Sequence, residues 1–489
     1  MAVTLIKNID TIVSCDEKDT VYRNADILVR DNLIESIMPA DGGRHGDGSS
    51  VCDFRTEEPS PCLPLSPTVS GSAASLTGPA PAPDRVIDGT GMFCYPGLIN
   101  THHHLYQMFS RNLPEVQNME LFDWLKTLYE IWKNLDEDVI RLSSLTGMGE
   151  LMKYGCTTCF DHHYVFPHGS GDLIGTQFAA ADELGIRMYA SRGSMDLSVK
   201  DGGLPPDSVV QTVDEIMRDS AELIDRFNDK SYGAMHRIAL APCSPFSVSK
   251  ELLKESAVLA REYGVRLHTH LCETLDEEKY MLEREGMRPL AYMESLGWVG
   301  DDVWFAHGIH FNDDELDTLA VTGTGIAHCP ISNMKLSSGI ARIPEMLAKG
   351  IKIGLAVDGS ASNDGSNLLE EIRVAYLLHR LNSSKAAPSG YDILKLATAG
   401  SASVLGRGDI GSLAPGKCAD LFLIDSRRFE LTGAGFDPAS VFATVGLKGP
   451  VDLCMVNGRV TVENGRLTAI DEERTAYDAN RKCREYLGR

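Results

Sequence analysis

The stretch Pro96-Gly-Leu-Ile-Asn-Thr-His-His-His-Leu-Tyr-Gln107 decides the fold class, because it leads from an apolar strand directly into three histidines. Side chains alternate along a strand, so His102 and His104 point to one side and His103 to the other. Two imidazoles on one face at the carboxyl end of a strand make half of a metal site. An HxH pair also arises by chance in ordinary strands, so this stretch alone only suggests a metal.

Short apolar strands alternate with helical patterns over the following 300 or so residues, to about residue 405. In residues 249–270, Ser249 can cap a helix, Gly264 can end it, and a strand follows. Repeated strand–helix units of this kind predict an α/β fold, specifically a distorted (β/α)₈ TIM-like barrel. A doubly wound sheet is the alternative, but no Gly-rich phosphate turn follows a strand, so we favour the barrel.

Both ends of the chain have strand patterns instead. We expect residues 1–95 and 405–489 to pack together as one small β domain beside a barrel of residues 96–404, with a charged surface helix at the end of the chain. Residues 41–83 contain seven Pro, seven Ser and six Gly, together 20 of 43 residues. So few large apolar side chains predict a flexible loop there.

Composition excludes several classes of protein. The 489 residues are 43% hydrophobic and 24% charged, as in globular proteins, and carry a net charge of −23. An acidic surface repels nucleic acid and anionic membranes, so we expect neither as a partner. No apolar run approaches the roughly 18 residues of a membrane span, and the N-terminal residues lack a signal-peptide pattern. Twelve scattered cysteines suit reduced thiols. We therefore expect a soluble cytoplasmic enzyme.

Three more apolar strands end in residues that bind metals or move protons. Residues 265–273 place His268 and His270 on one face, followed by Glu273. His307 ends another strand, and Asp358 directly follows a third. Because the strands of a parallel barrel deliver their carboxyl ends to one mouth, these side chains should converge. A catalytic metal needs three or four N/O ligands and an open position, which this set supplies.

The chain resembles the amidohydrolase superfamily, in its cytosine/guanine-deaminase and triazine-hydrolase branch. The resemblance runs nearly from end to end, except in residues 41–83, and rests on PGLINTHHHLYQ (96–107), HTHLCET (268–274), FAHG (305–308), HCPISNMKLSSG (328–339), VDGSASNDGSN (357–367) and GSLAPGKCADLFLID (411–425). It implies the same barrel with a β-sandwich made from both termini.

The resemblance also implies a set of metal ligands. His102 and His104 would come from the first strand, His270 from a later one, and Asp358 would be the fourth ligand and the group that activates water. No Lys occupies the strand between residues 185 and 195, where binuclear members carry a bridging lysine. One divalent metal ion is therefore expected, zinc first and iron as the alternative.

Roles for three other residues follow from the resemblance. Glu273 corresponds to the general acid/base, and His307 to the histidine that polarises the substrate or holds the hydroxide. We interpret Gln107 as a substrate contact, because its carboxamide can both donate to and accept from an amide-like ring edge. Trp124, Tyr164 and Arg192 could line the pocket or simply pack.

The expected reaction is hydrolytic deamination of an aminated heterocyclic base, a hydrolase acting on C–N bonds in cyclic amidines. The resemblance favours 8-oxoguanine, which would give urate and ammonia, through shared HHHLYQ, DHHY (161–164) and APCSPFS (241–247). Hydroxyatrazine-type s-triazine N-alkylaminohydrolases are the alternative, and guanine, isoguanine or cytosine deaminases come after them. Adenosine-type deaminases carry His where Cys243 stands. A homo-oligomer is a further expectation from the family.

A catalytically silent homologue, serving as a structural protein, is the competing class. Silent members typically lose ligands, whereas every expected ligand is present here. A metal assay separates the two classes, because a silent scaffold should hold no stoichiometric metal.

Overall fold

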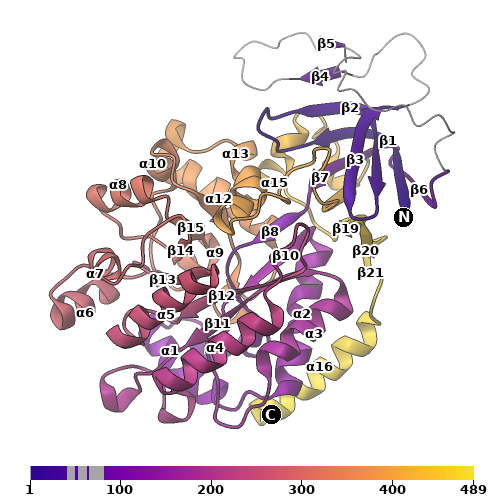
Figure 1. Ribbon diagram of the computed structural model, residues 1–489. Coiled ribbons are helices and arrows are strands. Elements are labelled where there is room, and N and C mark those ends of the chain that lie inside the picture. Colours follow the sequence, from indigo (N-terminus) through magenta and orange to yellow (C-terminus); the bar gives the residue numbers. More distant parts are fainter. Residues whose placement is uncertain (1, 41–49, 53–62, 65–81) are drawn as a thin grey trace.

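The computed structural model describes residues 2–40, 50–52, 63–64 and 82–489 (Figure 1). Its centre is a barrel of parallel strands, in which neighbours along the chain pair with each other. The first and last strands meet where the Thr101 N–H donates to the Leu355 carbonyl over 3.3 Å. The eight strands are β8 (Leu98–Asn100), β10 (Cys156–Asp161), β11 (Arg187–Ser194), β12 (His236–Pro242), β13 (Arg266–Leu271), β14 (Val303–His307), β15 (Gly325–His328) and β16 (Ile353–Leu355).

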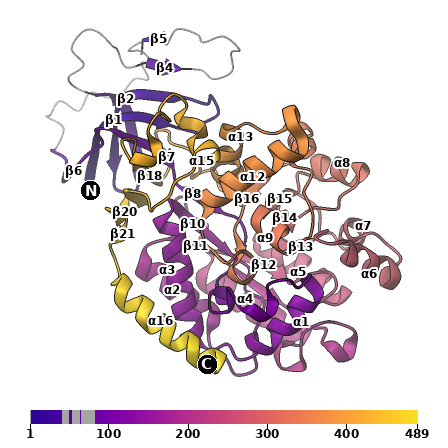
Figure 2. The ribbon, with the colours of Figure 1, turned by 180° about the vertical axis from the view of Figure 1, so that it is seen from behind.

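Helices follow the barrel strands and cover them from outside (Figures 1 and 2). The predicted unit at residues 249–270 is confirmed: Ser249 caps the helix, Gly264 ends it in the left-handed region, and β13 follows. The longer helices are α1 (Leu121–Trp132), α2 (Glu137–Lys153), α3 (Leu173–Leu184), α4 (Val213–Phe227), α5 (Lys250–Tyr263), α6 (Leu275–Glu285), α8 (Asp313–Thr322) and α12 (Leu368–Ser383). Shorter helices are α7 (Pro289–Ser295), α9 (Pro330–Lys335), α10 (Ile343–Ala348), α11 (Ser360–Asn363), α13 (Gly390–Lys395), α14 (Ser401–Val404) and α15 (Val441–Thr444).

Strands from both ends of the chain form a second sheet beside the barrel (Figure 1). The N-terminal and C-terminal parts join where β7 pairs antiparallel with β18, and apolar side chains of both parts share one core. The fold class predicted from the sequence is confirmed. The strands are β1 (Val3–Val13), β2 (Val21–Arg30), β3 (Leu33–Pro39), β4 (Ser50–Cys52), β5 (Leu63–Pro64), β6 (Arg85–Asp88), β7 (Met92–Pro96), β18 (Leu421–Asp425), β19 (Leu453–Val456), β20 (Arg459–Glu463) and β21 (Arg466–Leu467).

The remaining predictions concern residues 41–83, the domain boundaries, the charged helix at the end of the chain, the cysteines and membrane-spanning segments. Most of residues 41–83, predicted to be a flexible loop, lies outside the described residues, and the domain boundaries at 95/96 and 404/405 stay predictions. The charged helix is present as α16 (Glu472–Leu487), which lies along α2 (Figure 2). Ten cysteines, among them Cys15, Cys243 and Cys483, are free thiols, and of these ten all but Cys483 are buried. Within those ranges no helix has the length and apolar character needed to cross a bilayer.

Candidate metal centre

The ends of the first and last barrel strands continue toward each other as a second short parallel pair. Strand β9 (His103–His104) pairs with β17 (Asp358–Gly359), with Asp358 opposite His103. The Asp358 N–H also donates to the His102 carbonyl over 3.1 Å. Two segments about 250 residues apart in the sequence thereby bring the first histidine pair beside the carboxylate.

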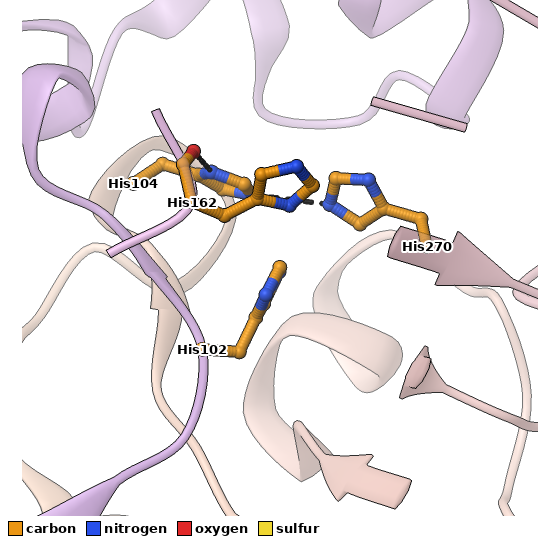
Figure 3. Close-up of side chains that lie close together, drawn as sticks. All are labelled: His102, His104, His162 and His270. Carbon is orange, nitrogen blue, oxygen red and sulfur yellow. Dashed lines mark hydrogen bonds between the residues drawn. The ribbon is translucent and has the colours of Figure 1, made fainter. Parts of the chain in front are cut away.

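Four predicted ligands meet at one point. The Oδ1 atom of Asp358 lies 3.2 Å from Nε2 of His102 and 3.2 Å from Nε2 of His104. The Nε2 atoms of His104 and His270 are also 3.2 Å apart. Figure 3 shows His102, His104 and His270 gathered around one space. These atoms belong to two overlapping groups whose ligand atoms lie within 4.8 Å of one another.

The hydrogen bonds behind two of the rings fix which nitrogen carries the proton. Nδ1 of His104 donates to the carbonyl of His162 over 2.6 Å, and Nδ1 of His270 donates to the carbonyl of Cys243 over 2.6 Å. A carbonyl can only accept, so each neutral ring keeps a lone pair on Nε2. Both Nε2 lone pairs therefore face the centre, as metal binding requires.

His102 is held by another histidine rather than by a carbonyl. Nδ1 of His268 donates to the Trp304 carbonyl over 2.9 Å, which leaves Nε2 of His268 as an acceptor. That Nε2 lies 2.8 Å from Nδ1 of His102 and accepts a hydrogen bond from the Nδ1–H of His102. The sequence placed His268 on the ligand face, and the structure places it behind His102 instead, as the residue that sets the tautomer of that ligand.

The donor set fits a divalent cation. Three imidazole lone pairs and one carboxylate oxygen converge with no hydrogen between them, and Nε2 of His102 is buried without a hydrogen-bond partner. Acceptors this close repel one another unless a positive charge lies among them. Burial also lowers the pKa of His270 to about 3, which keeps the ring neutral and able to bind metal.

Beside this centre, Glu273 and His307 form an acid–base pair. Oε2 of Glu273 lies 3.5 Å from Nε2 of His307, and Ser338 donates to Oε1 of Glu273 over 3.1 Å. Burial raises the pKa of Glu273. Burial lowers the pKa of His307, but the carboxylates of Glu273 and Asp358 more than offset this, so it lies above its ordinary value. Two titratable groups paired in this way can hold a proton and pass it on.

The backbone around these groups is unusual. Cys272, His307 and Asp358 all have positive φ angles, of 53°, 70° and 63°, in the left-handed region that non-glycine residues seldom occupy. Strained residues of this kind persist only where the surroundings hold them, and they concentrate at functional sites. Here each follows or ends a barrel strand and turns the chain at the metal centre.

The comparisons with known proteins agree with this geometry. The model of the amidohydrolase family matches residues 93–461. The chain belongs to the amidohydrolase family. It is 48% identical to an 8-oxoguanine deaminase of Pseudomonas aeruginosa, over 77% of this chain and 83% of the relative. It is 40% identical to a hydroxydechloroatrazine ethylaminohydrolase of Pseudomonas sp. strain ADP, over 98% and 95% of the two chains.

Solved structures extend the likeness to the whole chain. An atrazine chlorohydrolase of Arthrobacter aurescens TC1, complexed with zinc, superposes with a TM-score of 0.86 at 32% identity and covers 98% of this chain and 100% of its own. A triazine hydrolase variant superposes with a TM-score of 0.88, also at 32% identity, covering 99% and 100%. The family match and the deaminase and ethylaminohydrolase relatives indicate that this amidohydrolase is a hydrolase of C–N bonds, and the zinc-complexed structure together with the His/Asp cluster supports a divalent metal.

A cavity opens over the metal centre of this amidohydrolase. Of the residues left open by the sequence, Trp124 and Tyr164 line it, whereas buried Arg192 turns away to Asp219 and Gln211. Its lining includes the predicted site residues His104, Gln107, His270, Glu273, His307 and Asp358 together with Ser362, and the mostly apolar side chains of Leu121, Trp124, Leu125, Tyr164, Cys243, Phe246 and Leu336.

Sequence reasoning missed some members of the site. His162, which was named from the sequence only within the stretch DHHY (161–164), belongs to one of the two metal-capable groups, and its ring stacks on His270 with centroids 4.8 Å apart. The rule that found the ligands applies to it too, because it directly follows strand β10. Ser332 and Ser362, which donate to Oδ2 of Asp358 over 2.5 and 3.0 Å, carry no such signal.

Proposed function

We propose that this protein hydrolytically deaminates an aminated heterocyclic base, with 8-oxoguanine as the first candidate and urate and ammonia as its products. The observation that carries the proposal is the arrangement of Glu273, His307 and Asp358 around one cavity, beside three imidazoles whose lone pairs converge. The 48% identity to an 8-oxoguanine deaminase supports this choice of base.

We propose one divalent metal ion, held by His102, His104, His270 and Asp358. Zinc is the first choice, since a relative of 32% identity is complexed with zinc, and ferrous iron is the alternative because it accepts the same ligand types. When bound, the ion acts as a Lewis acid and lowers the pKa of a water molecule bound to it from 15.7 towards about 7.

The residues of the chain then divide the proton transfers between them. Asp358 takes a proton from the attacking water, and the oxygen adds to the ring carbon that bears the amino group. Glu273 gives its proton to the adjacent ring nitrogen, and Asp358 passes the proton that it took from water to the amino group. The C–N bond then breaks with release of ammonia, and the hydroxyl proton on the tetrahedral carbon passes to Glu273 as the carbonyl forms. His307, held in place by its Nδ1–H donating to Asn333 over 2.8 Å, stabilises the charge that develops on the substrate.

We propose that Gln107 orients the ring. It lines the cavity, and its Oε1 accepts from the Ala361 N–H over 3.3 Å, which leaves its amide N–H groups for a ring carbonyl. The apolar wall around Trp124 suits the faces of a flat ring.

A second candidate is removal of an alkylamine from a hydroxyatrazine-type s-triazine. It is supported by 40% identity to a hydroxydechloroatrazine ethylaminohydrolase over nearly the whole chain. Guanine, isoguanine and cytosine come after it as substrates. A small heterocycle, and no nucleic acid, is the partner we propose, because the net charge of −23 repels polyanions. We also propose a cytoplasmic location and a homo-oligomer.

The deciding experiment measures ammonia released by metal-replete protein from 8-oxoguanine, guanine, isoguanine, isocytosine, cytosine, adenosine, hydroxyatrazine and melamine. Turnover of 8-oxoguanine with urate formed is the expected result. Alkylamine from hydroxyatrazine, with no ammonia from any free base, would replace the first candidate by the second. No product from any of them, with metal bound, would contradict the proposal.

Replacing Glu273 by Gln tests the mechanism. The variant should keep its metal, because Glu273 is no ligand, and lose about 10²–10⁴-fold in kcat through the missing proton transfer. Glu278→Gln is the matched control: it makes the same change five residues later, where Glu278 pairs with Arg288 over 2.5 Å. Full turnover by Glu273→Gln at full metal occupancy would remove Glu273 from the mechanism.

A further inference from the structure

A buried carboxylate that none of the steps above uses lies directly behind Glu273. Glu277, in the first turn of α6, is 1% exposed. Its Oε1 accepts from the Cys272 N–H over 3.0 Å, and its Oε2 accepts from the Glu273 N–H over 2.9 Å. Both oxygens are thus bonded to the backbone of the turn that carries Glu273 into the cavity.

This arrangement departs from the ordinary cap of a helix. In a capping box the glutamate three residues after the cap accepts from the backbone N–H of the capping residue itself. Helices α4 and α8 follow that rule: Glu215 accepts from the Thr212 N–H over 2.9 Å, and Glu315 from the Asn312 N–H over 2.8 Å. Glu277 has the same spacing from the capping residue of its helix. Its carboxylate, however, accepts from the backbone N–H groups one and two residues before that capping residue.

The turn at Cys272 and Glu273, to which Glu277 binds, has a backbone conformation that residues other than glycine seldom adopt. Cys272 has a φ of 53°, and two successive N–H groups about such a residue form a concavity that binds an anion. The left-handed conformation of Cys272 sets the direction in which the chain leaves β13, and therefore where the carboxyl group of Glu273 lies. Ser338 and His307 hold that carboxyl group from the cavity side.

We infer that Glu277 is a positioning residue for proton transfer: by binding the backbone N–H groups of Cys272 and Glu273 it fixes the Glu273 carboxyl at the reacting ring. The inference rests on the proposed role of Glu273. Glu277 lies outside the residues that line the cavity and outside the metal-capable groups, so its effect should fall on turnover and not on binding.

The test is Glu277→Gln, assayed as metal-replete protein on the best substrate of the panel. In this variant an NH₂ group replaces one of the two oxygens, and it would face a backbone N–H group from which that oxygen accepted. We expect kcat to fall about 10–100-fold, as for other groups that orient catalytic residues, with KM and metal content unchanged. Glu277→Asp, which keeps the charge on a shorter arm, provides a second variant if the first folds poorly.

Two further variants keep the outcomes apart. Glu215→Gln removes an ordinary capping-box carboxylate and should leave kcat unchanged. Glu273→Gln tests the role on which the inference rests: if it retains full turnover, that role and the inference fall together. If Glu273→Gln is inactive while both Glu277 variants turn over like the parent, the inference alone is wrong. A loss of kcat that merely follows lost folded protein or metal would also overturn it.

Discussion

Replacing His268 by Asn should weaken metal binding although His268 touches no metal. The side-chain amide of Asn superposes on the Nδ1 side of the His268 imidazole, so it can still donate to the Trp304 carbonyl. No atom remains, however, where Nε2 of His268 accepted from His102. The 2.8 Å bond to His102 is then lost inside a fully buried site. In the metal-bound state the Nδ1–H of His102 has no partner.

The size of the loss in metal affinity depends on whether the unpaired N–H of His102 destabilises the metal-bound state, the metal-free state or both. A buried unsatisfied donor costs about 1–3 kcal/mol. In the metal-free state His102 can move its proton to Nε2 and donate to Asp358, 3.2 Å away, so the cost is confined to the metal-bound state. At 1.4 kcal/mol for each tenfold change, metal affinity should fall about 5–150-fold, in line with the 10–100-fold typical of such outer partners.

The assay is competition for Zn²⁺ with a chromophoric chelator. Two variants control it: His268→Gln, which places an amide near the lost Nε2, should recover most of the affinity, and His379→Asn changes a buried histidine outside the centre, paired with His328 over 3.1 Å. Unchanged affinity in His268→Asn, or an equal loss in His379→Asn, would refute the argument that His268 sets the tautomer of His102.

Two other predictions concern the cavity wall and acid stability. A methyl group added at Gly359 would lie 1.9 Å from Oε1 of Gln107, so Gly359→Ala should displace that side chain and lower kcat/KM by as much as we expect for Gln107→Ala. The double variant should show no further loss of kcat/KM, and additive losses would contradict a shared cause. Burial lowers the pKa of His103 and of His163 to about 3, so both stay neutral in the folded protein. In the unfolded chain both histidines take up a proton near the usual histidine pKa of about 6.5. The free energy of unfolding should therefore fall as the pH is lowered from about 6.5 towards 3. Denaturant titrations that give the same free energy of unfolding across that window would contradict this.

The fold could be predicted because local patterns and global topology agree. A cap at Ser249, a stop at Gly264 and a period-two strand after it define one unit, and repetition of that unit leaves few topologies. The pairing of β9 with β17 could not be predicted, because two-residue strands have no period to detect. It forms only after the barrel brings residues 103 and 358 together.

The candidate site was predictable where side chains carry the chemistry and not where the backbone does. Histidines at strand ends are visible in the sequence, but the carbonyls of Cys243 and Trp304 that hold them are not. The apolar wall on α1 was not predictable for another reason. Leu121, Trp124 and Leu125 follow the i, i+3, i+4 spacing of any helix that packs on a core, and only the folded chain shows that they line a cavity.

The two halves of the site are therefore held by different means. The predicted ligands stand at strand ends, and their rings are held from behind, by backbone carbonyls for His104 and His270 and by His268 for His102. Most of the wall consists of side chains on α1 and on connecting segments. Cys243 belongs to both: its carbonyl fixes His270, and its side chain lines the cavity. Exchanging that side chain changes the shape offered to a ring while the carbonyl still holds the ligand. A family can in this way vary its heterocycle and keep one metal centre.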